Sequence, residues 1–124
     1  MPRYFTVDEA NTTLVTLKPL IKEILEIRQS ILEQQPEVWP ALQKTVGNGG
    51  NKAASLAALE FARLDELVRQ VQAGGVLLKD INIGLLDFPS LREGREVYLC
   101  WRYGEDSVQY WHDLDAGYAG RQKL

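Results

Sequence analysis

The amino-acid sequence predicts an α+β fold in which a long antiparallel helical hairpin is followed by a small, mostly antiparallel sheet of three or four strands. Up to about residue 73, apolar residues recur every three or four positions, as on one face of a helix. After Gly74-Gly75 they alternate with polar residues, as in half-buried strands. A chain of 124 residues has room for one domain. We therefore expect 1–124 to form a single domain, with the hairpin in 1–73 and the sheet and a C-terminal loop in 74–124.

The first predicted helix begins at Thr6-Val7-Asp8-Glu9, a capping box in which Thr6 and Glu9 satisfy each other's backbone amides. Pro19 lies inside the helical pattern and predicts a kink rather than two helices. Pro36 ends the helix. The apolar stripe is broken only at Arg28 and consists of Val7, Ala10, Leu14, Leu17, Ile21, Ile24 and Ile31.

The second predicted long helix covers about residues 52–73 and ends at Gly74-Gly75, since glycine accepts the left-handed conformation of a helix C-cap. A short helical turn is expected between Val38 and Val46, followed by a glycine-rich linker at about 47–51. The segment Gly47–Ser55 does not match a phosphate-binding loop, because Asn51 precedes Lys52 and no strand comes before it. Two long helices joined by this linker are expected to pack antiparallel.

The sheet is predicted from three apolar segments and one turn. Val76–Leu78 and Leu85–Phe88, which Pro89 closes, are the first two candidate strands. Arg95–Arg102 is the clearest strand, and Ser107–His112 returns beside it after a turn. In Arg95–Arg102, alternation places Val97, Leu99 and Trp101 on one side. The other side carries Glu96, Tyr98, Cys100 and Arg102. The last twelve residues have no regular pattern.

Composition excludes several classes of protein. Lys and Arg number 14 against 17 Asp and Glu, a net charge of −3, so no excess of positive charge favours nucleic acid or anionic lipid as a partner. The single cysteine excludes an internal disulfide, and the single histidine excludes a multi-histidine metal cage. The longest apolar run, Val97–Trp101, is far shorter than the roughly 18 residues that span a membrane. The first residues also lack the apolar core of a signal peptide. We therefore expect a cytoplasmic protein.

His112, Asp113 and Asp115, with Glu105 nearby, are the best candidate metal ligands, and Asp80 and Asp87 at the ends of the first two strands could join them. One imidazole and two or three carboxylates can hold a divalent ion with open coordination positions. Neighbouring strand residues point to opposite faces, so His112 and Asp113 converge only if the strand ends there. The alternative is a strand-end histidine bonded to a carboxylate or a backbone carbonyl, with the aspartates in turns.

Three further features have a structural and a functional interpretation. Cys100 is expected to be a buried, inert thiol, and His112 is the one histidine that could activate it as a nucleophile. The arginines Arg95, Arg102 and Arg121 can clamp an anionic ligand or pair with neighbouring acids. Seven aromatic residues lie between Phe88 and Tyr118. They can form a base-stacking platform or cover the sheet, and the lack of positive charge favours the second role.

Several segments carry a resemblance to a known family. They are Gly75-Val76 with Lys79-Asp80, Gly84–Pro89, Gly94–Arg102, Gly104-Glu105, and Trp111–Asp113 through Gly117 to Gly120-Arg121, with the opening Tyr4–Asn11. Together they resemble a prokaryotic family known as a domain of unknown function, number 2203 in its series. The resemblance implies a small bacterial α+β protein and supplies no activity. The chemically notable residues at the family's motif positions are Asp80, Asp87, Glu105, His112, Asp113, Gly117 and Arg121.

Two functions from different classes follow as hypotheses. The first is an interaction or ligand-binding module without catalysis. We expect it to form a homodimer through its helices, since the first helix has more aliphatic positions than one partner helix covers. Its candidate ligand or partner site comprises Asp80, Asp87, Arg95, Glu105 and Arg121. The second is a metal-binding protein or metal-assisted hydrolase whose divalent ion is held by His112, Asp113 and Asp115 and activates water.

Overall fold

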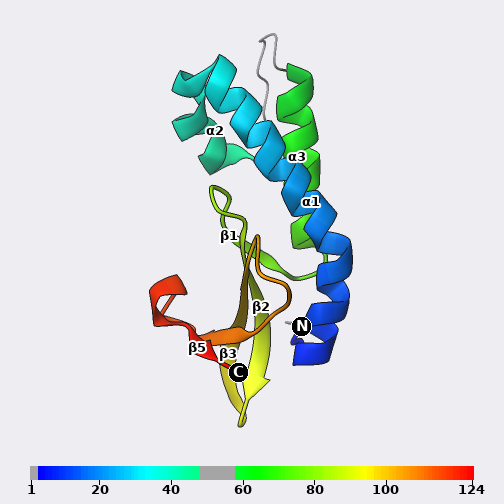
Figure 1. The fold of residues 1–124 in the computed structure, drawn as a ribbon, viewed down its shortest axis with the longest axis vertical. Helices are drawn as coiled ribbons and strands as arrows, with labels where there is room; N and C mark the ends of the chain where they lie inside the picture. Colours follow the sequence, from blue (N-terminus) through cyan, green and yellow to red (C-terminus); the bar gives the residue numbers. More distant parts are fainter. Residues whose placement is uncertain (1–2, 48–57) are drawn as a thin grey trace.

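The computed structural model describes residues 3–47 and 58–124, and every structural statement below concerns these residues (Figure 1). Its helical elements are α1 (Val7–Gln34), η1 (Pro36–Val38), α2 (Trp39–Thr45), α3 (Ala58–Ala73) and η2 (Tyr118–Gly120). Its strands are β1 (Leu77–Asp80), β2 (Leu85–Arg92), β3 (Arg95–Arg102), β4 (Tyr110–Asp113) and β5 (Gln122–Lys123). The fold is therefore α+β, with helices followed by a sheet. No helix in the described part combines the length and hydropathy needed to cross a membrane.

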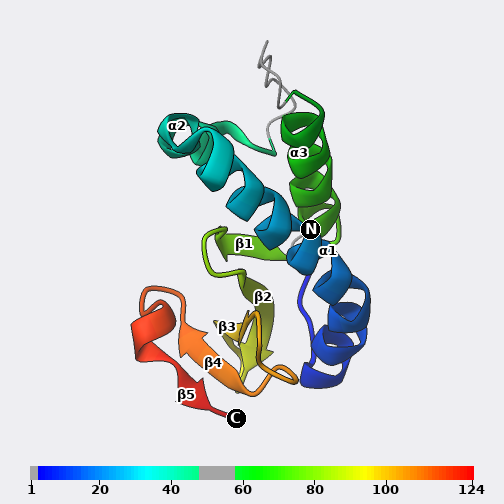
Figure 2. The same cartoon turned by 45° about the horizontal axis from the view of Figure 1, so that its top comes forward.

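Helix α1 joins the two halves of the molecule (Figures 1 and 2). Its N-terminus has the predicted capping box, and it continues as one helix through Pro19. The N-terminal part lies against the sheet half, where the Asn11 side chain accepts a hydrogen bond at 2.7 Å from the amide of Val108, in the connection between β3 and β4. The C-terminal part packs beside α3, where Glu23 pairs with Arg63 at 2.7 Å. The apolar stripe of α1 thus packs against both the sheet half and α3.

The helical half differs from a simple hairpin. Helix α3 runs back along α1 (Figure 1), but η1 and α2 lie between them in the chain. Helix α2 is the short helix expected between Val38 and Val46. The described part of α3 begins at Ala58, so the predicted start at residue 52 and the linker residues 48–51 lie outside the described residues. Gly75 ends this half with φ +89°, as a glycine C-cap requires.

The sheet has five strands rather than three or four, in the order β1-β2-β3-β4-β5, all antiparallel. The additional strand is β5, two residues of the segment predicted to be irregular. It pairs Lys123 with Tyr110 and Gln122 with Trp111 along the outer edge of β4. Two residues are too few to produce an alternating pattern, so the sequence carries no signal for this strand.

Pro89 does not close β2, contrary to the prediction, because the strand continues to Arg92. Proline interrupts a sheet where its missing N–H is needed by a neighbouring strand. Strand β1 pairs with β2 only as far as Asp87, so this side of Pro89 has no ladder to interrupt. The Pro89 carbonyl on this side accepts a hydrogen bond from the Phe5 amide at 2.7 Å.

The two faces of the sheet have different chemistry. One face packs in the core with α1 and carries Leu86, Phe88, Leu99 and Trp101. The rings of Phe5 and Phe88 meet edge to face there, with centroids 5.3 Å apart. The other face carries Tyr98, Cys100 and Arg102, as alternation along β3 predicts. The side chains that bear chemistry gather on this second face.

Candidate metal centre

Three buried ligand-type side chains meet on the sheet face turned away from α1. Asp87 of β2, Cys100 of β3 and His112 of β4 expose 2%, 0% and 2% of their surface. Asp87 lies directly opposite Cys100, and His112 lies opposite Tyr98, two residues from Cys100 on the same side of β3. A carboxylate oxygen, the thiol sulfur and an imidazole nitrogen lie within 4.8 Å of one another. Three adjacent strands thus bring together the group we call the Asp87–Cys100–His112 cluster.

Both ring nitrogens of His112 have partners. Nδ1 lies 2.7 Å from the backbone carbonyl oxygen of Asp113, and Nε2 lies 3.0 Å from Oδ1 of Asp87. A carbonyl oxygen only accepts, so Nδ1 carries a hydrogen and donates it. The contact between Nε2 and Oδ1 then requires one further proton, held on either the imidazole or the carboxyl group. In both arrangements the Asp87–His112 pair has no net charge.

Cys100 is a protonated thiol at neutral pH. Burial raises the pKa of Cys100 to about 12, and the neighbouring Asp87 carboxylate contributes to the increase. The Arg121 guanidinium acts in the opposite direction without cancelling these effects. A nucleophilic cysteine needs a lowered pKa and an exposed sulfur. The position of Cys100 therefore does not support nucleophilic catalysis, although His112 is close.

Arg121 and Glu105 pair beside this cluster. Nη1 of Arg121 donates to Oε1 of Glu105 at 3.0 Å, and the same oxygen accepts from the Arg102 amide at 2.7 Å. The Arg121 guanidinium also lies against the rings of Tyr110 and Tyr118, 4.1 and 4.3 Å from their centroids. Arg121 is thus a paired cation that links the C-terminal segment to the sheet.

The cluster has the donor types and spacing of a tetrahedral metal site. In a tetrahedral zinc site, bond lengths near 2.0–2.3 Å place neighbouring ligand atoms about 3.3–3.8 Å apart. The 3.0 Å contact and the 4.8 Å limit in the cluster bracket that range. The hydrogen bond from Nδ1 of His112 to a backbone carbonyl is the outer contact that commonly orients a metal-binding histidine. The cluster thus supplies three donors of the kinds found in a tetrahedral site, at a comparable spacing.

The predicted trio of His112, Asp113 and Asp115 is not brought together. The Asp113 carboxylate pairs with Arg95 at 3.1 Å, while Asp115 is exposed in the following turn. Strand β4 extends to Asp113, so the condition for His112 and Asp113 to converge is not met. The alternative expectation is confirmed for His112, whose ring contacts one carboxylate and one backbone carbonyl, and for Asp115, which lies in a turn. It is wrong for Asp113, which is the last residue of β4.

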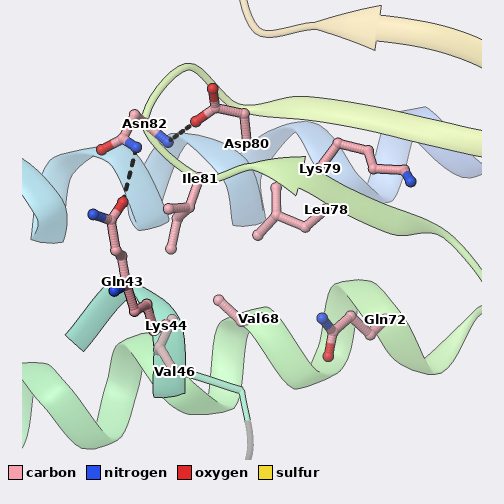
Figure 3. Close-up of a pocket in the computed structure, with 10 residues that line it drawn as sticks. All are labelled: Gln43, Lys44, Val46, Val68, Gln72, Leu78, Lys79, Asp80, Ile81 and Asn82. Carbon is pink, nitrogen blue, oxygen red and sulfur yellow. Dashed lines mark hydrogen bonds between the residues drawn. The ribbon is translucent and has the colours of Figure 1, made fainter. Parts of the chain in front are cut away.

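The five predicted ligand or partner residues also divide. Asp87, Glu105 and Arg121 lie in or beside the cluster, whereas Arg95 pairs with Asp113. Asp80 lies in a separate pocket of about 320 Å³ between β1, α2 and α3 (Figure 3). Its carboxylate accepts from the Asn82 amide at 2.9 Å and shapes the turn after β1.

Asn82, which also lines that pocket, is held by several side-chain hydrogen bonds of the fold. Asn82 Oδ1 accepts from Arg28 at 2.8 Å and from the Trp39 indole at 2.9 Å. Its amide group donates to Gln43 at 3.0 Å (Figure 3). Asn82 therefore ties α1, α2 and the turn after β1 together.

The cross-strand pairing of Asp87 with Cys100 is not among the predictions from sequence, although the sequence carries a signal for it. Strands β2 and β3 are joined by the two-residue turn Glu93-Gly94, whose φ angles of +54° and +78° are those of a tight hairpin turn. Arg92 faces Arg95 across this turn, and counting back along both strands places Asp87 opposite Cys100.

Comparison with known proteins agrees with the sequence resemblance. Neither the curated proteins nor the solved structures gave a match to this chain. The model of a protein family described as "Uncharacterized conserved protein (DUF2203)" matches residues 3–124, which include every strand and all three residues of the cluster. The chain therefore belongs to the DUF2203 family.

Proposed function

We propose that this protein binds a thiophilic divalent metal ion, zinc above all, through Asp87, Cys100 and His112. The observation that carries the proposal is the convergence of three buried ligand atoms from three adjacent strands within 4.8 Å. A thiolate and an imidazole favour zinc over magnesium or calcium, which prefer sites made of oxygen ligands.

Charge balance supports metal binding at this buried position. The cluster holds one proton on the Cys100 thiol and one between Asp87 and His112, and it has no net charge. A divalent cation that displaces both protons meets one thiolate, one carboxylate and one neutral imidazole, so the charge is again zero. The exchange therefore avoids the large cost of burying an unpaired charge.

The burial of all three ligands favours a stabilising ion over one that activates water. A catalytic zinc ion keeps a coordination position that water and substrate reach, whereas structural sites are closed. Metal-assisted hydrolysis is therefore the weaker form of the hypothesis.

The non-catalytic ligand-binding module is the second candidate function, and the cavity described below favours it. We retain the homodimer through the helices and the cytoplasmic location as proposals.

The first test measures metal in the full-length protein purified without an affinity tag. We expect elemental analysis to find up to one zinc ion per chain, and added Co²⁺ to produce the visible absorption of a tetrahedral site with a thiolate ligand. The variants Cys100→Ser and Asp87→Asn should each weaken metal binding at least tenfold, since each removes one ligand. The matched controls Asp113→Asn and Asp115→Asn should bind as the wild type does.

The proposal fails if folded wild-type protein, confirmed by circular dichroism, binds neither Zn²⁺ nor Co²⁺ at micromolar concentrations. It also fails if Cys100→Ser binds both ions with unchanged affinity. A loss of binding in Asp115→Asn with none in Asp87→Asn would instead support the ligand set predicted from sequence.

A further inference from the structure

A second cavity lies on the same face of the sheet, beside the candidate metal site. Its volume is about 190 Å³, and it is lined by Tyr4, Pro89, Glu96, Val97, Tyr98 and Leu114. Tyr98 lines this cavity, and its ring also lies near His112, with the two ring centroids 5.5 Å apart. The cavity therefore adjoins the Asp87–Cys100–His112 cluster but includes none of its three residues.

The size and lining of the cavity suit a small apolar group. An apolar cavity of about 150 Å³ in another protein holds a benzene molecule, so about 190 Å³ holds one ring with a short substituent. Pro89, Leu114 and the two tyrosines provide apolar contacts, whereas the Val97 side chain is buried in the core. Leu114 is 48% exposed, which leaves one side of the cavity open to solvent.

Glu96 provides a negative charge at this cavity. It is the one charged residue among the described residues that line the cavity. One of its oxygens, Oε1, accepts a hydrogen bond from the Tyr4 hydroxyl. This bond raises the pKa of Tyr4, so the phenol keeps its proton and Glu96 remains the acceptor. Within the described part of the chain, no ion pair to a lysine or arginine neutralises Glu96.

We propose that this cavity binds a small apolar amine, with its ring or short chain in the cavity and its ammonium group at Glu96. An ammonium group donates to the carboxylate and matches its charge, whereas a carboxylate ligand would be repelled. The proposal goes beyond metal binding and does not depend on it, because the cavity contains no proposed metal ligand.

The test uses three probes of similar size: benzylamine, toluene and benzoate. Ligand-observed NMR with the full-length protein should show benzylamine binding with a Kd on the order of a millimolar, weaker binding of toluene, and none of benzoate. Glu96→Gln keeps an acceptor for Tyr4 and removes the charge, and it should weaken benzylamine binding up to roughly fivefold. Leu114→Trp should fill the cavity and abolish binding. The control Leu124→Trp changes an exposed leucine that does not line the cavity and should bind normally.

Two results would overturn the proposal. Benzylamine binding that survives Leu114→Trp unchanged, or is absent from the wild type, shows that the cavity is not the site. Equal binding of benzylamine and toluene, or no effect of Glu96→Gln, shows that the carboxylate does not select an amine. Leu114 lies in an exposed turn, so this substitution leaves the core intact, and an unchanged Tm verifies that. The cobalt spectrum of the wild type reports separately on the metal proposal.

Discussion

The hydrogen-bond partners of His112 determine which protons a metal ion must displace from its ring. Nδ1 donates its hydrogen to a backbone carbonyl, which only accepts, so this nitrogen keeps its hydrogen. Nε2 shares a proton with Asp87, and the Cys100 thiol with its pKa of about 12 holds another nearby. These two protons are the ones that an incoming metal ion must displace.

At this scale we predict that zinc binding releases two protons at neutral pH. Because protons are products, the affinity for zinc increases with pH, by up to about 100-fold per pH unit while both protons are held. The dependence on the thiol proton continues toward pH 12. Calorimetry in buffers of different ionisation enthalpy counts the protons. Cys100→Ala should release one, and a wild type that releases none would contradict the proposed ligands.

Among the elements, the turn between β1 and β2 packs closely against α1 at Gly84. Gly84 has φ +65°, and a Cβ atom there would lie 2.8 Å from Cγ2 of Ile21 and 2.9 Å from Cβ of Tyr103. The carbonyl of Gly84 also accepts a hydrogen bond from the Tyr103 amide at 3.0 Å. Only glycine fits both the backbone angle and the space.

We therefore predict that Gly84→Ala lowers the free energy of unfolding by about 2–4 kcal/mol, from backbone strain and overpacking together. Gly94→Ala is the matched control, because Gly94 has φ +78° but no atom within 4 Å of an added Cβ. Gly94→Ala should lower the free energy of unfolding by about 1–2 kcal/mol, from backbone strain alone. Urea unfolding measures both, and equal losses would show that the turn does not limit the approach of α1.

At the scale of the whole molecule, the apolar surface left exposed on the helices is the surface that a second copy of the chain could cover. The structure buries seven residues of α1, and Leu20, Leu25 and Leu32 pack partly buried against the core. Much of the surplus that suggested a dimer is thus used within one chain. Val15 on α1, 71% exposed, and Leu59 on α3, 87% exposed, are the clearest apolar side chains left on the helices.

A homodimer through the helices remains our prediction, and it depends on these two residues. Light scattering at micromolar concentration should give a particle of about twice 14.0 kDa, and Val15→Glu with Leu59→Glu should reduce it to one chain, since a buried charge opposes association. A wild-type particle of 14.0 kDa would contradict the dimer.

The sequence by itself determined the features that depend on neighbouring residues. The capping box at Thr6 and Glu9, the stop before Pro36 and the C-cap at Gly75 act within one turn of a helix, and all three are found as predicted. Alternation along β3 assigned Cys100 and Trp101 to opposite faces. Asp87 opposite Cys100 also belongs here, because a two-residue turn determines the register of β2 and β3.

Only the tertiary structure decided where His112 lies. Strands β3 and β4 are joined by residues 103–109, a connection too long to determine register, so the position of His112 opposite Tyr98 follows from packing. Trp111 is buried in the core, and because neighbouring residues of β4 point to opposite faces, burying Trp111 turns His112 to the other face. A shift of one residue would have exposed Trp111 and taken His112 away from Asp87. Hydrophobic packing thus completes the candidate metal site that local sequence rules left incomplete.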